Sequence, residues 1–400
     1  MAKSNKNSLL ISLFLFLGVL IFGYYFSVAG DKEENIKIEK AIFLPPPIKT
    51  DTINSKLDSI LKRYQSKTFF NGSVLVAYKG NVIHKNNYGY ADLRKKTPLT
   101  DSSIFQLASV SKQFTAAAIL ILVDEKKLKL TDKLRDFYPQ LPYEGITINH
   151  LLNHTSGLPL YFWYADHVWK SDTPPTNEQM IETMAKNEMK PFFAPGQKFE
   201  YSNTGYFILA SIVEKVSGQT FSNFLKTKLF DPLNMEHTYV YTYPFDSIRP
   251  YQLMGYQVNR RGRAREIPPF LNDGIFGDKN VYSTTKDLFL WLKGLNEGKI
   301  LSQNSLKLMY TQGKTNSGWK APYGMGFRLE NRNNENVIFH NGKWNGFRTS
   351  VKNYIDNDIW IILLNHTNYS NVSGITRQLN EFLKEEFKEN NYQTEQKNQN

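Results

Sequence analysis

The stretch FQLASVSKQF, residues 105–114, combines two serines and a lysine at the point where the chain becomes continuously apolar. Ser109 and Lys112 are three residues apart, about one turn of a helix, so both side chains lie on the same side. The apolar residues that follow, up to Val123, occupy every face of the predicted helix, which is typical of a buried helix. A lysine at the edge of such a helix loses hydration, which lowers its pKa and makes it usable as a base. The stretch therefore predicts an activated serine at a helix N-terminus, where backbone N–H groups favour developing negative charge.

The same residues also allow a purely structural interpretation. Serine is a frequent N-cap residue, and Ser111 lies on the wrong side of the helix to share Lys112, so we assign Ser111 a capping role. The spacing Ser-x-x-Lys occurs four times in the chain, so the spacing alone predicts nothing. Only the pair Ser109 and Lys112 opens a helix that is predicted to be fully buried.

Two later segments offer groups that could complete a site. The run PGQKFEYSNTGY contains Tyr201 and Asn203, which point to one side of an extended or turn conformation because they are two residues apart. The run FHNGKWNGF contains His340 and Gly342, and the glycine would allow a substrate backbone to approach closely. Each run by itself fits a structural role equally well, as a half-buried tyrosine or as a turn between strands.

The pattern of apolar residues predicts an α+β domain. Two strand-like runs near each end of the chain each form a hairpin, and the middle, from residue 111 to about 300, is mostly helical. We expect the two ends to join in one antiparallel sheet with the helical region packed beside it. The expected strands are 73–78, 81–85, 346–354 and 359–365, followed by a helix at 375–387.

The first thirty residues are expected to lie outside the fold. Lys3 and Lys6 precede a long uncharged apolar run, which indicates either a signal peptide cut after Ala29 or an uncut membrane anchor. The length of the run favours the anchor, with the rest of the chain outside the cytoplasm. The remaining predicted parts are a proline-containing tether at 31–50, the folded domain at 51–387 and a polar disordered tail at 388–400.

Composition excludes several classes of site. The chain has 400 residues, of which 41% are hydrophobic and 22% charged, as in ordinary globular proteins. It has no cysteine, so disulfides, thiol nucleophiles and zinc–thiolate sites are excluded. The net charge is +12, but no helix or stripe rich in lysine and arginine occurs, which argues against nucleic-acid binding. The run NRRGRAR, residues 259–265, is interpreted as a solvated loop, with contact to an anionic envelope polymer as the lesser alternative.

Taken in order, the three motifs Ser109-x-x-Lys112, Tyr201-Ser-Asn203 and His340-x-Gly342 resemble those of the class C β-lactamase family. That family includes penicillin-binding proteins of the DD-carboxypeptidase type, esterases and D-aminopeptidases. Four further runs also look like this family, and the resemblance extends over about residues 51–387. These runs are LLNHTSGL, PLNMEHT, VYSTTKDLFLW and YGMGF.

The resemblance implies a role for each residue. Ser109 would attack a carbonyl and become acylated, while Lys112 and Tyr201 share the proton, with Tyr201 as a phenolate-like base held by the charge of the lysine. Asn203 would bind the acyl side chain of the substrate, and the backbone N–H groups of Ser109 and Lys343 would form the oxyanion hole. Water would then release the acyl group, and the resemblance implies no metal and no cofactor.

The third motif departs from that of true β-lactamases. Those enzymes have Lys-Thr-Gly at this place, whereas this chain has His340 and contains no such lysine motif. A histidine is mostly neutral at pH 7, so we expect weak binding of anionic β-lactams and of anionic D-Ala-D-Ala ends. An ester, an amide or a modified peptide is the favoured substrate. The aromatic run YFWYADHVW, residues 161–169, either lines the pocket or packs the helical region.

The sequence therefore predicts an envelope serine hydrolase that acts on a small-molecule or peptide substrate, for example one derived from the cell wall. His340 and Gly342 join Asn203 and Lys343 as its substrate-binding residues. The protein would be held at the membrane by its N-terminal segment, or be secreted or periplasmic if that segment is cut. The alternative is a non-hydrolytic or slowly acylating penicillin-binding or sensor protein on the same fold. A tethered structural protein would leave the ordered motifs unexplained.

Overall fold

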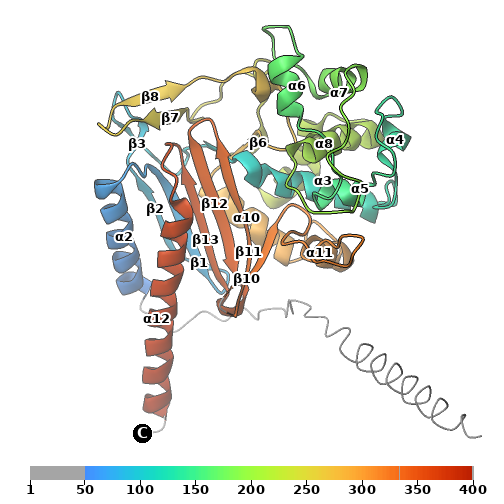
Figure 1. Cartoon of the computed structure of the whole chain (residues 1–400). Coiled ribbons are helices and arrows are strands. Elements are labelled where there is room, and N and C mark those ends of the chain that lie inside the picture. Colours follow the sequence, from blue (N-terminus) through green and yellow to red (C-terminus); the bar gives the residue numbers. More distant parts are fainter. Residues whose placement is uncertain (1–49, 333, 399–400) are drawn as a thin grey trace, which may run out of the picture. The chain divides into compact units, whose positions relative to one another are not determined.

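A six-stranded antiparallel sheet forms the centre of the domain in a computed structural model, which describes residues 50–332 and 334–398 (Figure 1). The strand order is β10-β11-β12-β13-β1-β2, so the first and last strands of the chain meet in the middle of the sheet. This confirms the predicted α+β fold with one sheet made from both chain ends. The strands are β1 (Gly72–Tyr78), β2 (Asn81–Tyr88), β10 (Arg328–Arg332), β11 (Glu335–Trp344), β12 (Phe347–Tyr354) and β13 (Ile359–Asn365).

The two central strands are apolar throughout because the sheet is covered on both faces. Gly72 of β1 pairs with Asn365 of β13, and every residue of both strands is buried. Alternate residues point to opposite faces, so each strand contributes to two separate hydrophobic clusters. The hairpin between β1 and β2 turns at Lys79 and Gly80, which have φ values of 47° and 71°. A two-residue turn with both residues in the left-handed region suits the twist of a tight hairpin.

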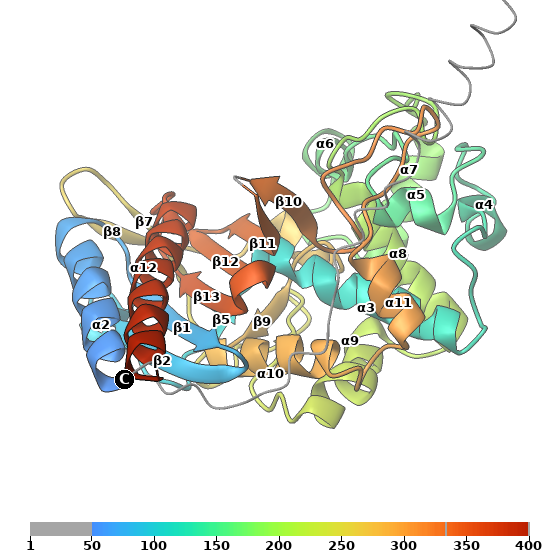
Figure 2. The same cartoon turned by 90° about the horizontal axis from the view of Figure 1, so that it is seen from below.

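Two helices, α2 (Thr50–Lys67) and α12 (Val372–Asn398), lie side by side on one face of the sheet (Figure 2). Leu379 and Leu383 of α12 are fully buried there, at the four-residue spacing of a helix face. Helix α12 extends to Asn398, whereas the sequence pattern predicted a polar disordered tail from residue 388. The residues around 385–389 are mostly lysine and glutamate, which propagate a helix that has already been started by its packed first turns.

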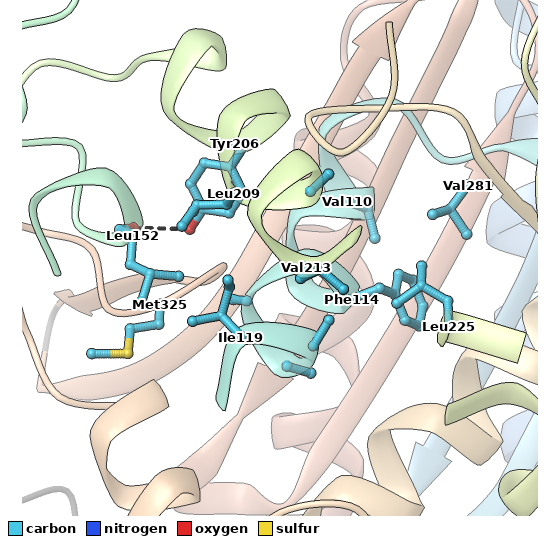
Figure 3. Packing of buried hydrophobic residues seen from close by; sticks show 14 of the residues in the cluster. Val110, Phe114, Ile119, Leu152, Tyr206, Leu209, Val213, Leu225, Val281 and Met325 are labelled. Atoms are coloured by element: carbon cyan, nitrogen blue, oxygen red, sulfur yellow. Dashed lines mark hydrogen bonds between the residues drawn. The ribbon is translucent and has the colours of Figure 1, made fainter. Parts of the chain in front are cut away.

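The helical region packs on the other face of the sheet, as predicted, with α3 at its centre. Helix α3 is buried from Lys112 to Leu122, and Phe114 of α3 belongs to the same hydrophobic cluster as Val110 of the preceding turn and Val213 of α8 (Figure 3). The helices of this region are α3 (Lys112–Asp124), α4 (Leu134–Phe137), α5 (Ile148–Leu152), α6 (Tyr161–His167), α7 (Asn177–Lys186), α8 (Asn203–Ser217), α9 (Phe221–Leu225), α10 (Thr285–Asn296) and α11 (Gln303–Met309).

Three small sheets, which the sequence pattern did not predict, connect the two regions. Their strands are β3 (Tyr90–Asp92) with β4 (Thr97–Pro98), β5 (Phe105–Gln106) with β9 (Val281–Ser283) and β6 (Tyr239–Val240), and β7 (Gly255–Val258) with β8 (Ala264–Ile267). The arginine-rich run forms the turn and second strand of the β7–β8 hairpin, and its four arginines are exposed. This exposure agrees with the interpretation of that run as a solvated segment.

The predicted anchor at residues 1–30 and nearly all of the tether lie outside the described residues, so their boundaries stay predictions. Within 50–332 and 334–398, no helix combines the length and apolar character needed to cross a membrane.

Candidate active site

Ser109 lies in a short 3₁₀ turn, η1 (Ala108–Ser111), that leads directly into α3. Ala108 has a φ of 51°, a left-handed conformation that is uncommon for a residue with a side chain. The turn leaves Ser109 half-exposed while Ala108 and Val110 are buried on either side of it. Backbone strain beside a single exposed serine is typical of functional sites.

Strand β11 lies against this turn, and Gly342 makes the close approach possible. A Cβ at position 342 would lie 2.2 Å from the carbonyl oxygen of Leu107, closer than real Cβ contacts allow. Thr349 of β12, which pairs with Gly342 of β11, donates a hydrogen bond of 2.8 Å to the same carbonyl. A glycine is therefore needed at position 342 for the sheet to pack closely against η1. The sequence analysis had predicted a different role, close approach of a substrate backbone to Gly342.

Beyond Phe339, the described pairings of β11 continue with β12 only, because the pairing with β10 ends at Phe339. Residues 340–344 thus have one backbone edge without a strand partner among the described residues. The side chain of Lys343 is exposed on this segment. An unpaired strand edge offers N–H and C=O groups to a ligand that lies alongside it.

Lys112 is completely buried and has three acceptors around its ammonium group. Its Nζ is 2.8 Å from Oδ1 of Asn203, 2.7 Å from the carbonyl oxygen of Asp278 and 3.3 Å from Oγ of Ser109. The pKa of Lys112 is lowered to about 7, mainly by burial; the charge of Asp278 opposes this shift, and the charge of Arg328 adds to it. A large fraction of Lys112 is therefore the neutral amine near pH 7.

These three acceptors also fix the direction in which the amine accepts a proton. A neutral amine has two N–H groups and one lone pair, and an amide oxygen and a carbonyl oxygen can only accept. The two N–H groups are therefore directed to Asn203 and to the carbonyl of Asp278. The lone pair remains for Ser109, the only one of the three partners with a proton to give.

Tyr201 lies near two basic side chains. The Nζ of Lys112 and the guanidinium carbon of Arg328 are each 5.1 Å from the centre of its ring. Its hydroxyl is buried and makes no hydrogen bond of good geometry with a described residue, although the nearby Ser109 hydroxyl acts to lower its pKa. Burial is the larger effect and raises the pKa of Tyr201 above its ordinary value. Tyr201 is therefore a neutral phenol at physiological pH.

A cluster of aromatic rings packs against Tyr201. The ring centre of His154 lies 4.3 Å from that of Tyr201, 4.4 Å from that of Tyr323 and 5.0 Å from that of Tyr206. His154 belongs to the run LLNHTSGL and Tyr323 to the run YGMGF, so these runs are the support of the site. The sequence analysis had used both runs only as marks of the resemblance.

His340 is part of this support and is buried to 1% exposure. Its Nδ1 is 2.8 Å from the carbonyl oxygen of Asn341, so Nδ1 carries the proton, and Nε2 accepts from the Tyr323 hydroxyl at 3.0 Å. Burial and the charges of Lys112 and Arg328 hold its pKa well below the ordinary value, so the ring is neutral. Direct binding of a substrate by His340 stays a prediction, and its burial favours a supporting role.

Arg328, at the start of β10, is a residue that the sequence analysis missed. Its guanidinium lies over Tyr201 and is 6.0 Å from the ring of Tyr323, and the side chain is only half-buried. Among the described residues no carboxylate forms an ion pair with it. The available signal was a charged residue directly after YGMGF and twelve positions before His340 (340 minus 328).

A stack of three aromatic rings lies near the same end of β11. Trp344 stacks on Phe162 at 5.5 Å and on Phe270 at 5.3 Å, and Phe270 is 42% exposed. The indole N–H of Trp344 donates to Asp273 at 2.6 Å, which fixes the ring. The run at 161–169 therefore divides, with Phe162 in this stack and Tyr161 in the core.

Ser111 does not cap α3, which corrects its assigned role. Its side chain makes no capping hydrogen bond, and its Oγ instead accepts from the backbone N–H of Val281 at 3.0 Å. The helix needs no such cap because η1 precedes it without a break. In the described ranges, no group of three or more histidine, aspartate or glutamate side chains is arranged to hold a metal ion.

The chain shares its fold, an antiparallel sheet made from both chain ends with a helical region on one face, with penicillin-binding proteins of known structure. The chain belongs to the β-lactamase family, because the family model described as Beta-lactamase matches residues 57–385. It is thus a β-lactamase-related serine hydrolase or penicillin-binding-like protein.

Individual relatives agree with this assignment. Penicillin-binding protein 4* of Bacillus subtilis (strain 168) is 34% identical over 320 residues, covering 78% of this chain and 71% of that protein. Protein flp of Staphylococcus aureus (strain MW2) is 29% identical over 345 residues, covering 83% and 66%. The octameric penicillin-binding protein homologue from Pyrococcus abyssi has a TM-score of 0.68 at 28% identity, covering 78% and 73%. The D-amino acid amidase from Ochrobactrum anthropi SV3 has a TM-score of 0.71 at 22% identity, covering 84% and 99%, a likeness of fold.

Proposed function

We propose that the chain is an envelope serine hydrolase that forms an acyl-enzyme at Ser109 with an ester, amide or peptide substrate. The observation that carries this proposal is the position of Lys112, whose amine lone pair is left for the Ser109 hydroxyl by two acceptors that cannot give a proton. Its pKa of about 7 makes that amine available at physiological pH.

The reaction would begin when the Lys112 amine takes the proton of Ser109 and Oγ forms a bond to the substrate carbonyl carbon. The bond from that carbon to the leaving group then breaks, and the proton passes from Lys112 through the Tyr201 hydroxyl to the leaving atom. Water then attacks the acyl carbon and gives a proton to Lys112, the bond from that carbon to Oγ of Ser109 breaks, and Lys112 returns the proton to Oγ. Because burial raises its pKa, Tyr201 relays the proton as a phenol rather than acting as the phenolate base that the resemblance implied.

The substrate would lie along the unpaired edge of residues 340–344. The backbone N–H groups of Ser109 and Lys343 remain our assignment for the oxyanion hole. Asn203 uses its oxygen to accept from Lys112, so its amide N–H groups are available to an acyl side chain.

The charge of the site changes the expected substrate preference. Weak binding of anionic ends was expected because His340 replaces a lysine, but Arg328 brings a guanidinium to the same group of residues from β10. We propose that Arg328 binds a substrate carboxylate, since a guanidinium fits a carboxylate with two parallel hydrogen bonds. The rings of Phe162, Trp344 and Phe270 would bind an apolar group of the same substrate.

The envelope location rests on the lysine-flanked apolar run at residues 1–30 and on the resemblance to penicillin-binding proteins. The run would hold the domain at the outer side of the cell membrane. Recovery of the native protein in the cytoplasmic fraction would contradict this location.

Intact mass spectrometry with a fluorophosphonate probe tests the proposed nucleophile. The wild-type chain is expected to gain one adduct, Ser109→Ala none, and the matched control Ser111→Ala one. Labelling of Ser109→Ala to the same extent as wild type would refute the assignment. Turnover of an activated ester by the wild type supports a hydrolase, whereas stoichiometric acylation without turnover favours the slowly acylating sensor.

A further inference from the structure

A second buried lysine, Lys279, follows the residue whose carbonyl oxygen contacts Lys112. The segment from Ile275 to Lys279 follows the turn η4 (Leu271–Gly274) and brings the carbonyl oxygen of Asp278 to 2.7 Å from the Nζ of Lys112. The side chains of Asp278 and Lys279 are only 2% and 3% exposed. Neither side chain takes part in the reaction steps above.

The two side chains form a closed network with Tyr161 of α6. The carboxylate of Asp278 accepts from the Tyr161 hydroxyl at 3.0 Å and from the Nζ of Lys279 at 3.4 Å. Lys279 also donates to the Tyr161 hydroxyl at 2.7 Å and to the carbonyl oxygen of Ile275 at 3.1 Å. All three donors of the ammonium group therefore have an acceptor, and the hydroxyl both donates and accepts.

A buried ion pair of this kind is not an obvious source of stability. Removing two charges from water costs free energy, and an apolar pair of similar volume often gives a protein of the same stability as the ion pair. The pair lies beside the one lysine whose protonation state controls the proposed chemistry. An unbalanced charge close to Lys112 would strongly change the protonation state of Lys112.

We propose that Asp278, Lys279 and Tyr161 form a positioning unit that directs the carbonyl of residue 278 at Lys112 and cancels the charge of Asp278 there. This inference rests on the proposed function of Lys112 as the base. The network fixes the side chain of Asp278, so the carbonyl of the same residue keeps its direction. The ammonium of Lys279 offsets the carboxylate, so Lys112 is not held in its protonated form.

Apart from Asp278, no group that faces Lys112 in the described part of the chain carries a negative charge. The others are neutral rings or carry positive charge, so Asp278 is the source of the attraction that raises the pKa of Lys112. The titratable and charged groups that face Lys112 are His154 after α5, Tyr201 before α8, Tyr206 on α8, Asp278 and Lys279 in their segment, Arg328 on β10 and His340 on β11.

The test is the pH dependence of kcat/KM for an activated ester, measured on the full-length chain. In the wild type, activity is expected to fall as pH drops through about 7, because Lys112 takes up a proton. Lys279→Met leaves the Asp278 carboxylate unbalanced and favours the ammonium form of Lys112. The acid limb of the profile, where kcat/KM falls as pH drops, should therefore move up by about one pH unit. Asp278→Asn should move it down, by less, because an unpaired buried ammonium tends to lose its own proton. The double variant should return close to the wild-type limb.

The matched control is Asp287→Asn, which removes another buried carboxylate that accepts from His237 and Thr238 instead. Its acid limb should stay where the wild type has it. Folding of each variant is checked by circular dichroism, and if Lys279→Met does not fold, the direction of the shift in Asp278→Asn decides. Folded variants with unshifted limbs would overturn the inference while wild-type turnover leaves the proposed function intact. Absence of any turnover that depends on Ser109 would instead refute the proposed function itself.

Discussion

Four side chains from distant parts of the sequence determine the charge beside Ser109, the proposed nucleophile. Lys112 is the proposed base, Arg328 adds a positive charge over Tyr201, and Asp278 adds a negative charge that Lys279 balances. With Asp278 and Lys279 balanced, Arg328 leaves the site with an excess of positive charge. This arrangement suits a substrate that carries a carboxylate near the bond to be cleaved.

Arg328 is expected to determine the preference for anionic substrates. Replacement by Gln in R328Q removes the charge but keeps hydrogen-bonding groups, so KM for a peptide substrate with a free carboxylate should rise about 10- to 100-fold, as for the loss of a charge-assisted pair. KM for a neutral ester should rise less than threefold, roughly. The comparison of the two substrates in steady-state kinetics is the measurement. Equal losses for both would show that Arg328 only supports the ring of Tyr201.

The sequence predicted the motif residues of the candidate site but not the site residues that lie outside the three motifs. The pair Ser109 and Lys112 was predictable because a one-turn spacing before an apolar helix has a local physical meaning. Arg328 and Trp344 were not, because their place at the site depends on how β10 and β11 pair in the folded sheet. The role of Ser111 was wrongly assigned because its true partner, Val281, is 170 residues away.

At the scale of elements, the contact between β11 and η1 connects the sheet to Ser109, the proposed nucleophile. The strained turn at Ala108 is held from one side by Thr349 and Gly342 and from the other by α3. The sheet is predictable from alternating and apolar runs at both chain ends. The small strands β5, β6 and β9 were not, since two- or three-residue strands carry too little pattern to be distinguished from loops.

Gly342→Ala tests this contact. The added Cβ would meet the Leu107 carbonyl, so β11 or η1 must shift, at a cost of about 1–3 kcal/mol in the free energy of unfolding. The rate of Ser109 labelling should fall at least tenfold, roughly, because a displacement of about 1 Å can cost that much or more. Denaturant unfolding and probe labelling provide the two values.

The control is Gly318→Ala, where no atom lies within 4 Å of the new Cβ and only the φ of 82° opposes the change. It should lose about 1–2 kcal/mol of stability and keep its labelling rate. If Gly342→Ala labelled at the wild-type rate, the close packing of β11 on η1 would not be what positions Ser109.

At the scale of the whole domain, the shared sheet makes the two hydrophobic clusters one cooperative unit. Strands β1 and β13 contribute alternate residues to the cluster under α2 and α12 and to the cluster around α3. Loss of packing on the face of the sheet away from the site should therefore unfold the site as well. The chemistry itself should not respond until the whole domain unfolds.

Leu379→Ala is the corresponding test. Leu379 is fully buried on α12, so its truncation should lower the free energy of unfolding by about 2–5 kcal/mol. The kcat/KM of the folded variant at 25 °C should equal that of the wild type, because none of the proposed site residues is a member of this cluster. Ellipticity and Ser109 labelling should be lost at the same, lowered denaturant concentration. Loss of helical signal well before loss of labelling would mean that the α2 and α12 face unfolds independently, and that a sheet built from both chain ends does not by itself couple the two clusters.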